Sequence, residues 1–160
     1  MQFIKVEGTY LKNVYRNFVL EALEEYPAHF EFALSEAEKW DAERWADRAG
    51  LAYLACKEES YLGTVSLRQD TGYSTHVGEV KFMYVPRRFQ GNGLGRTLLY
   101  QIETVARERG IERLFLTVVN PNPAFKLYEK AGYIVHGYEM DIRRVAGEKY
   151  GRYLLHKVLG

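Results

Sequence analysis

Hydrophobic residues in the first third of the chain recur at the three-and-four spacing of an amphipathic helix. The residues on this face are Leu11, Val14, Tyr15, Phe18, Ala22, Leu23 and Tyr26. We expect a helix that ends at Pro27, preceded by a short strand in residues 2–7, where polar and apolar positions alternate weakly. A capping box formed by Ser35 and Glu38 predicts a second helix, which ends at Gly50.

After residue 50, short runs rich in β-branched and aromatic residues replace the helical spacing and are typical of strands. The predicted strands cover residues 51–57, 61–68, 75–85, 113–119, 133–142 and 152–159. Two further helices are expected among them, one from a glycine-rich segment to Gly110 and one from Asn122 and Pro123 to Gly132. Helices interleaved with strands predict an α/β protein with a sheet of mixed strand direction.

Composition narrows the class of protein. The chain has 160 residues, and without a linker-like segment this length predicts a single domain, residues 1–160. A formal net charge of +1 disfavours a general nucleic-acid binder, which needs a basic surface. The single cysteine, Cys56, cannot form an intramolecular disulfide, and no signal-like or membrane-spanning segment is expected. We therefore expect a cytoplasmic protein with neither a membrane nor a nucleic acid as its partner.

A glycine-rich segment, Gln-Gly-Asn-Gly-Leu-Gly-Arg at residues 90–96, lies between a predicted strand and a predicted helix. The first turn of a helix leaves amides unpaired, and glycines let a phosphate approach the backbone, so an anion site is expected here. A plain turn is the alternative. A Walker A loop does not fit, because Arg96 and Thr97 follow Gly95, and the glycine spacing does not fit the dinucleotide motif G-x-G-x-x-G.

The spacing Gln90-x-x-Gly93-x-Gly95 resembles the pyrophosphate loop of the GNAT superfamily of acetyl-CoA-dependent N-acetyltransferases. A second segment, Leu-Tyr-Glu-Lys-Ala-Gly-Tyr at residues 127–133, resembles another signature of that family and follows in the right order. Alone it could be an ordinary amphipathic helix. The resemblance is strong over residues 75–142. It implies a central mixed, mostly antiparallel twisted sheet of about six to seven strands, flanked by about four helices.

The resemblance implies acetyl-CoA as cosubstrate and no metal. The backbone around Met83, Tyr84 and Val85 would pair with the pantetheine arm, and Phe125 would belong to the cofactor site. The implied pyrophosphate site comprises Gln90, Gly91, Asn92, Gly93, Leu94, Gly95 and Arg96.

An asparagine that the family usually carries seven residues before its tyrosine is replaced here by Pro121. Either flanking residue could take over its contact with the cofactor. Because Asn122 also serves as a helix cap, the sequence favours Asn120.

Tyr128 matches the tyrosine that protonates the departing CoA thiolate, and a phenol keeps its proton at neutral pH. A base must remove the proton of the attacking amine, and the best candidate is Glu79. The alternative for Glu79 is an ion pair with Lys81 on the strand surface. Other candidate bases are His29, His76 and His136. Because Cys56 has no partner histidine nearby in sequence, we expect direct attack in a ternary complex.

The predicted function is transfer of an acetyl group to the primary amine of a small molecule or peptide. The alternative is a non-catalytic acyl-CoA-binding or sensor module on the same fold. Residues 80–102 hold four basic and no acidic residues, as a polyanionic cofactor requires. Residues 21–50 hold nine acidic and three basic residues, which favours a cationic amine acceptor unless they form a solvated helix face. The outer edge of the C-terminal strands needs cover and suggests a homodimer.

Overall fold

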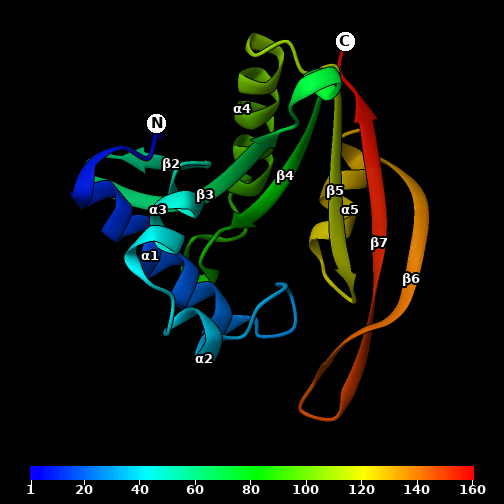
Figure 1. Cartoon of the computed structure of the whole chain (residues 1–160), viewed down its shortest axis with the longest axis horizontal. Coiled ribbons are helices and arrows are strands. Elements are labelled where there is room, and N and C mark those ends of the chain that lie inside the picture. Colours follow the sequence, from blue (N-terminus) through cyan, green and yellow to red (C-terminus); the bar gives the residue numbers. More distant parts are fainter.

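The computed structural model describes residues 1–160 and has one twisted seven-stranded sheet at its centre (Figure 1). The strands are β1 (Gln2–Lys5), β2 (Ala52–Lys57), β3 (Ser60–Gln69), β4 (Val77–Tyr84), β5 (Arg113–Asn120), β6 (Ile134–Val145) and β7 (Glu148–Val158). Their order is β1-β2-β3-β4-β5-β7-β6, and every neighbouring pair is antiparallel except β4 and β5. The predicted mixed, mostly antiparallel sheet of six to seven strands is confirmed.

Helices cover both faces of this sheet. They are α1 (Gly8–Glu25), α2 (Leu34–Ala37), α3 (Ala42–Ala49), α4 (Leu94–Glu108) and α5 (Ala124–Lys130). Alternate residues of β2 belong to two different cores, with Tyr53 and Ala55 under α4 and Leu54 under α1. Since successive strand residues point to opposite faces, one core lies on each side of the sheet. None of the helices combines the length and the apolar character needed to span a lipid bilayer.

The parallel pair of β4 and β5 separates soon after it begins. Residues Val77 to Glu79 pair with Arg113 to Phe115, and the two strands then diverge (Figure 1). A bulge in the pairing of β3 with β4 follows at once and changes the direction of the side chains. Val80 joins the core under α4, whereas Phe82 joins the core under α1. The edge of β4 beyond Glu79 is thus left without a strand on its β5 side.

Residues 35–50 form two short helices, α2 and α3, in place of the predicted single helix. Ser35 lies inside α2, and the cap position, Ala33, makes no side-chain hydrogen bond, so the predicted capping box is wrong. Asp41 explains why a separate helix, α3, begins here. Its carboxylate accepts a hydrogen bond from the backbone N–H of Arg44 at 2.9 Å and caps α3.

The C-terminal hairpin is longer than predicted. The strands β6 and β7 continue to Val145 and Glu148, and only residues 146–147 form the turn. Every residue of β6 is exposed or half-buried, so no buried apolar position marks the end of the strand. Backbone pairing, rather than side-chain burial, extends this hairpin.

Candidate active site

A cavity of about 440 Å³ lies where β4 and β5 diverge. On one side, its walls come from β4, the glycine loop, the start of α4, β5 and α5. The other walls come from the end of α1 and the loop after it, from α3 and from the β6–β7 hairpin. One cavity therefore joins the predicted cofactor loop to the first helices and to the C-terminal hairpin.

The free edge of β4 forms one wall of the cavity. Residues 80–85 all line it, and they include the predicted Met83, Tyr84 and Val85. At these positions β4 pairs with β3 and has no partner on the β5 side. The backbone N–H and C=O groups along this edge are thus available to an extended ligand, which could pair with them as an added strand.

The glycine loop brings the N-terminus of α4 to the same cavity. Gly91 and Gly93 have φ angles of +89° and +78°, which glycine adopts without steric cost. The first intrahelical hydrogen bond runs from the N–H of Thr97 to the carbonyl of Gly93 at 3.1 Å, so the amides of residues 94–96 precede it. No acidic side chain occupies this first turn. The site offers unpaired N–H groups and the positive end of the helix dipole, as an anion requires.

Six of the seven predicted loop residues line the cavity, and Asn92 does not. Those on the cavity wall are Gln90, Gly91, Gly93, Leu94, Gly95 and Arg96. Gln90 also holds the loop in place, because its side-chain amide donates to the carbonyl of Val85 at 2.8 Å and to the hydroxyl of Tyr26 at 2.9 Å.

Acidic residues of α1 hold the two arginines that precede the glycines. The carboxylate of Glu25 accepts the backbone N–H of Arg87 at 2.8 Å, and Glu21 forms a salt bridge with Arg88.

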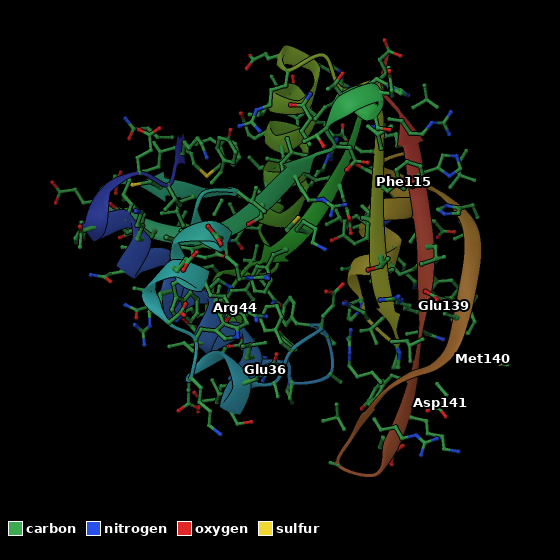
Figure 2. The ribbon with its side chains drawn as sticks, in the orientation of Figure 1. Glu36, Arg44, Phe115, Glu139, Met140 and Asp141 are labelled. Atoms are coloured by element: carbon green, nitrogen blue, oxygen red, sulfur yellow. The ribbon has the colours of Figure 1, made fainter.

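Charged residues of α2 and α3 also pair with each other. Glu36 of α2 lies 3.9 Å from Arg44 of α3, and the two side chains are neighbours in Figure 2. Of the nine acidic residues in the segment 21–50, only Glu31 lines the cavity. The structure therefore does not support a predominantly acidic acceptor site.

Tyr128 of α5 reaches the cavity from the second sequence motif. The residue is 7% exposed, its hydroxyl has no hydrogen-bond partner in the protein, and burial raises the pKa of the phenol well above its usual value. The phenol is therefore protonated at neutral pH and available to donate to a ligand atom.

The residues around Pro121 differ in their relation to the cavity. Asn122 lines it, and its side-chain carbonyl accepts the backbone N–H of Ala124 at 2.9 Å, as expected of a helix cap. Asn120 does not line the cavity and donates from its amide to the hydroxyl of Tyr138 at 3.2 Å. Phe125 also lies outside the lining, where its ring packs on Tyr153 at 4.5 Å between centroids.

Glu79 is the last residue of β4 that pairs with β5, where it lies opposite Phe115, and it does not line the cavity. Its carboxylate is 2.8 Å from the guanidinium of Arg68 and 3.5 Å from the ammonium group of Lys81. The ion pair with Lys81, which the sequence left as the alternative, is thus present in the structure.

Among the candidate histidines, only His29 lines the cavity. Its ring stacks on Tyr26 with centroids 4.8 Å apart. Burial, and then the positive charge of Arg143, lower the pKa of His29 below its ordinary value. The imidazole is therefore neutral at pH 7, as a general base must be. His76 and His136 lie outside the lining, and the latter pairs with His156 at 3.1 Å.

Several residues on the cavity wall carried no signal in the sequence. They are Tyr26, Phe30, Glu31, Phe32, Arg48, Arg143 and Arg152. They come from a loop, a short helix and a hairpin that are far apart along the chain. No local pattern identifies them, because only the tertiary fold brings them to one place.

The diverging β4–β5 pair, the glycine loop at the start of α4 and the buried Tyr128 thus meet at one cavity. The sequence model of the Acetyltransferase (GNAT) family matches residues 15–133, and the chain belongs to this family.

Relatives and solved structures agree with this assignment. The chain is 32% identical over 113 residues to the mycothiol acetyltransferase of Thermomonospora curvata, a match that covers 70% of this chain but only 37% of that relative. The chain superposes on the ribosomal-protein-alanine N-acetyltransferase of Brucella melitensis with a TM-score of 0.77 and 21% identity, covering 99% and 100% of the two chains. A putative acetyltransferase from Salmonella typhimurium, solved with its cofactor acetyl-CoA, gives a TM-score of 0.79 at 16% identity, covering 100% and 94%. These two structures share the fold.

Proposed function

We propose that the protein transfers an acetyl group from acetyl-CoA to the primary amine of a small molecule or peptide. The observation that carries this proposal is one cavity that combines the first-turn amides of α4, the free edge of β4 and the hydroxyl of Tyr128. A pyrophosphate, an extended amide-containing arm and a thiolate leaving group need these three features. Membership of the acetyltransferase family supports the same function.

The residues of the cavity fit the cofactor chemically. The amides of residues 91–96, together with the side chain of Arg96, would hold the pyrophosphate. The backbone of residues 83–85 would pair with the amides of the pantetheine arm. We assign the asparagine contact to Asn122 rather than Asn120, because Asn122 lines the cavity and its amide N–H groups remain free while its carbonyl caps α5.

When bound, acetyl-CoA supplies an acetyl thioester and a thiolate leaving group. The neutral amine forms a bond to the acetyl carbon, the carbon–sulfur bond breaks, and a base of the chain takes the proton that the amine loses. The O–H of Tyr128 donates to the sulfur as negative charge develops there. Cys56 is buried in β2 and does not line the cavity, which supports direct attack in a ternary complex.

Two residues compete for the role of base. Glu79 remains the candidate from the sequence, but it does not line the cavity, and its carboxylate forms ion pairs with Arg68 and Lys81. His29 lines the cavity and is neutral at pH 7. We infer that His29 is the better placed of the two, and variants of both residues distinguish them.

Ligand-dependent melting followed by a turnover assay tests the proposed function. Acetyl-CoA should raise the melting temperature, with a stabilisation of about 2.7 kcal/mol at 100 times its Kd, and NAD should not. Thiol release is then measured over a panel of primary amines. No thermal shift at millimolar acetyl-CoA would reject the cofactor, and a shift without thiol release from any amine would favour the sensor module.

A further inference from the structure

The charge of the cavity wall is mainly positive beside the loop of residues 27–33. The basic side chains on the wall, apart from Arg96 at the glycine loop, are Arg48, Lys81, Arg143 and Arg152, and the one acidic side chain is Glu31. Such a wall attracts an anionic ligand and repels a polycation.

Carboxylates of the protein neutralise only part of this charge. Arg152 is bound by Glu139 of β6 at 2.7 Å, and Lys81 is 3.5 Å from Glu79. Neither Arg143 nor Arg48 forms a salt bridge with any residue, and the Nε atom of Arg48 is buried without a hydrogen-bond partner. Two guanidinium groups on the wall thus have no protein anion as partner.

Arg143 is held in a fixed position at the cavity. Its Nη1 donates to the backbone carbonyl of Ala28 at 2.7 Å and so ties the β6–β7 hairpin to the loop after α1. A guanidinium has five N–H donors, and this contact uses one of them. Burial lowers the pKa of Arg143. The negative charge of Glu31 opposes this shift, and the positive charge of Arg152 adds to it more weakly. A half-buried cation in this environment gains from the arrival of an anion.

We propose that the acceptor amine also carries an acid group, with a carboxylate as the simplest case, and that Arg143 binds this group. The proposal rests on the acetyltransferase function above and narrows its substrate to anionic amines such as amino acids. The planar guanidinium suits a carboxylate because two parallel N–H···O bonds form at once. Arg152 and Lys81 add attraction over a longer range.

Matched acceptors test this proposal, each pair being an α-amino acid and its amide, compared at the same concentration of neutral amine because the amide is the weaker base. Thiol release from acetyl-CoA should show kcat/KM at least about tenfold higher for the acid than for the amide. Arg143→Gln should lower kcat/KM roughly 10- to 100-fold for the acid and less than about threefold for the amide. Equal turnover of acid and amide by the wild type, or an unchanged preference in the variant, would overturn the proposal.

Arg144→Gln is the matched control. This neighbouring arginine is exposed, binds Asp141 at 2.9 Å and does not line the cavity, so its loss should leave the preference for acids unchanged. A loss of preference equal to that of Arg143→Gln would mean that the net charge of the hairpin, rather than Arg143, selects the acid.

A binding measurement separates this proposal from the proposed function. With CoA present, an N-acetyl amino acid should raise the melting temperature more than its amide does, and this difference should vanish in Arg143→Gln. Turnover of amides without acids would refute the acid site and leave the acetyltransferase standing. Absence of thiol release from every amine would refute the acetyltransferase, and the melting difference would still decide whether the acid site exists.

Discussion

The chemistry available to Tyr128 is set by its residue type and its burial. Its side chain was identified from the second motif, and its place in α5 gives it a buried, protonated hydroxyl at the cavity. The ordinary pKa of a phenol already exceeds that of a thiol, and burial raises the pKa of Tyr128 further, so complete proton transfer to a thiolate is uphill. In the proposed reaction, the hydroxyl would therefore contribute mainly a hydrogen bond to the developing charge on sulfur.

Replacing Tyr128 with Phe should lower kcat roughly 10- to 100-fold, the effect of one hydrogen bond to a charged atom, of about 1.5–3 kcal/mol. The affinity for acetyl-CoA should stay nearly constant. Tyr133→Phe is the control, because that hydroxyl donates to the buried Glu103 at 3.0 Å and lies outside the cavity lining. It should cost about 1.5–3 kcal/mol of stability and leave kcat unchanged. Equal kcat losses in the two variants would contradict the role of Tyr128.

The pH dependence of activity should reflect His29. Because its pKa is lowered and its neutral form is the active one, kcat/KM should stay constant as pH falls past the ordinary histidine value and decline only below it. In His29→Gln this acidic limb should disappear and kcat/KM should fall roughly 100-fold at pH 7.

Glu79→Gln provides the comparison for this profile. Since Glu79 does not line the cavity and forms ion pairs with Arg68 and Lys81, its loss should leave the acidic limb in place. If the limb instead vanishes in Glu79→Gln and persists in His29→Gln, Glu79 is the base that the sequence suggested.

At the scale of elements, the strand–loop–helix unit of β4, the glycine loop and α4 could be predicted because its signals are local. Glycines mark the left-handed turn, and the apolar face of α4 has helical spacing. The single helix expected over residues 35–50 failed for an equally local reason, since Asp41 is a better cap than the capping box at Ser35. Boundaries depend on competition between neighbouring signals, and the sequence shows each signal without showing which prevails.

Replacing Gly93 with Ala should weaken binding of acetyl-CoA at least tenfold, because the new methyl group projects where the pyrophosphate must approach the backbone. In the structure this methyl group would meet no atom within 4 Å, so the cost to stability is only that of the positive φ, about 1 kcal/mol. Isothermal titration and thermal unfolding measure the two effects separately.

Gly110→Ala is the matched control at the C-terminal end of α4. Gly110 has a φ of +77° and equal free space around it, so the loss of stability should be similar. It does not line the cavity, and its substitution should leave the affinity for acetyl-CoA unchanged. A similar loss of affinity in both variants would show that backbone strain, rather than the methyl group, weakens binding.

At the scale of the whole molecule, β6 is one of the two edge strands of the sheet, and its side chains are largely open to solvent. Ile134 is 63% exposed and Met140 is 81% exposed, and Met140 lies on the outer side of the strand in Figure 2. An uncovered strand edge with apolar side chains can pair with another strand. The homodimer through the C-terminal strands stays a prediction, and β6 is where its interface should form.

Light scattering after size exclusion should give a mass near twice 18.6 kDa. Met140→Lys should shift the mass toward the monomer, because a charge at the strand edge opposes pairing. Tyr100→Lys is the control, since Tyr100 is 64% exposed on α4, on a different surface. A monomeric wild type would reject the dimer, and equal effects of both variants would reject the β6 interface.

The sequence by itself determined the local elements that form the proposed cofactor side of this protein. The loop at Gly93 and the helix of Tyr128 are encoded by backbone preferences and hydrophobic spacing within short segments, so no distant residue was needed to recognise them. The acceptor side was decided by the tertiary structure. Glu21 and Arg88 are 67 residues apart and neutralise each other, whereas Arg143 reaches Ala28 across 115 residues and keeps its charge on the cavity wall. Charge counts along the chain suggested an acidic acceptor site, but Coulomb interactions depend on distance in space, and only the order of strands in the sheet sets those distances.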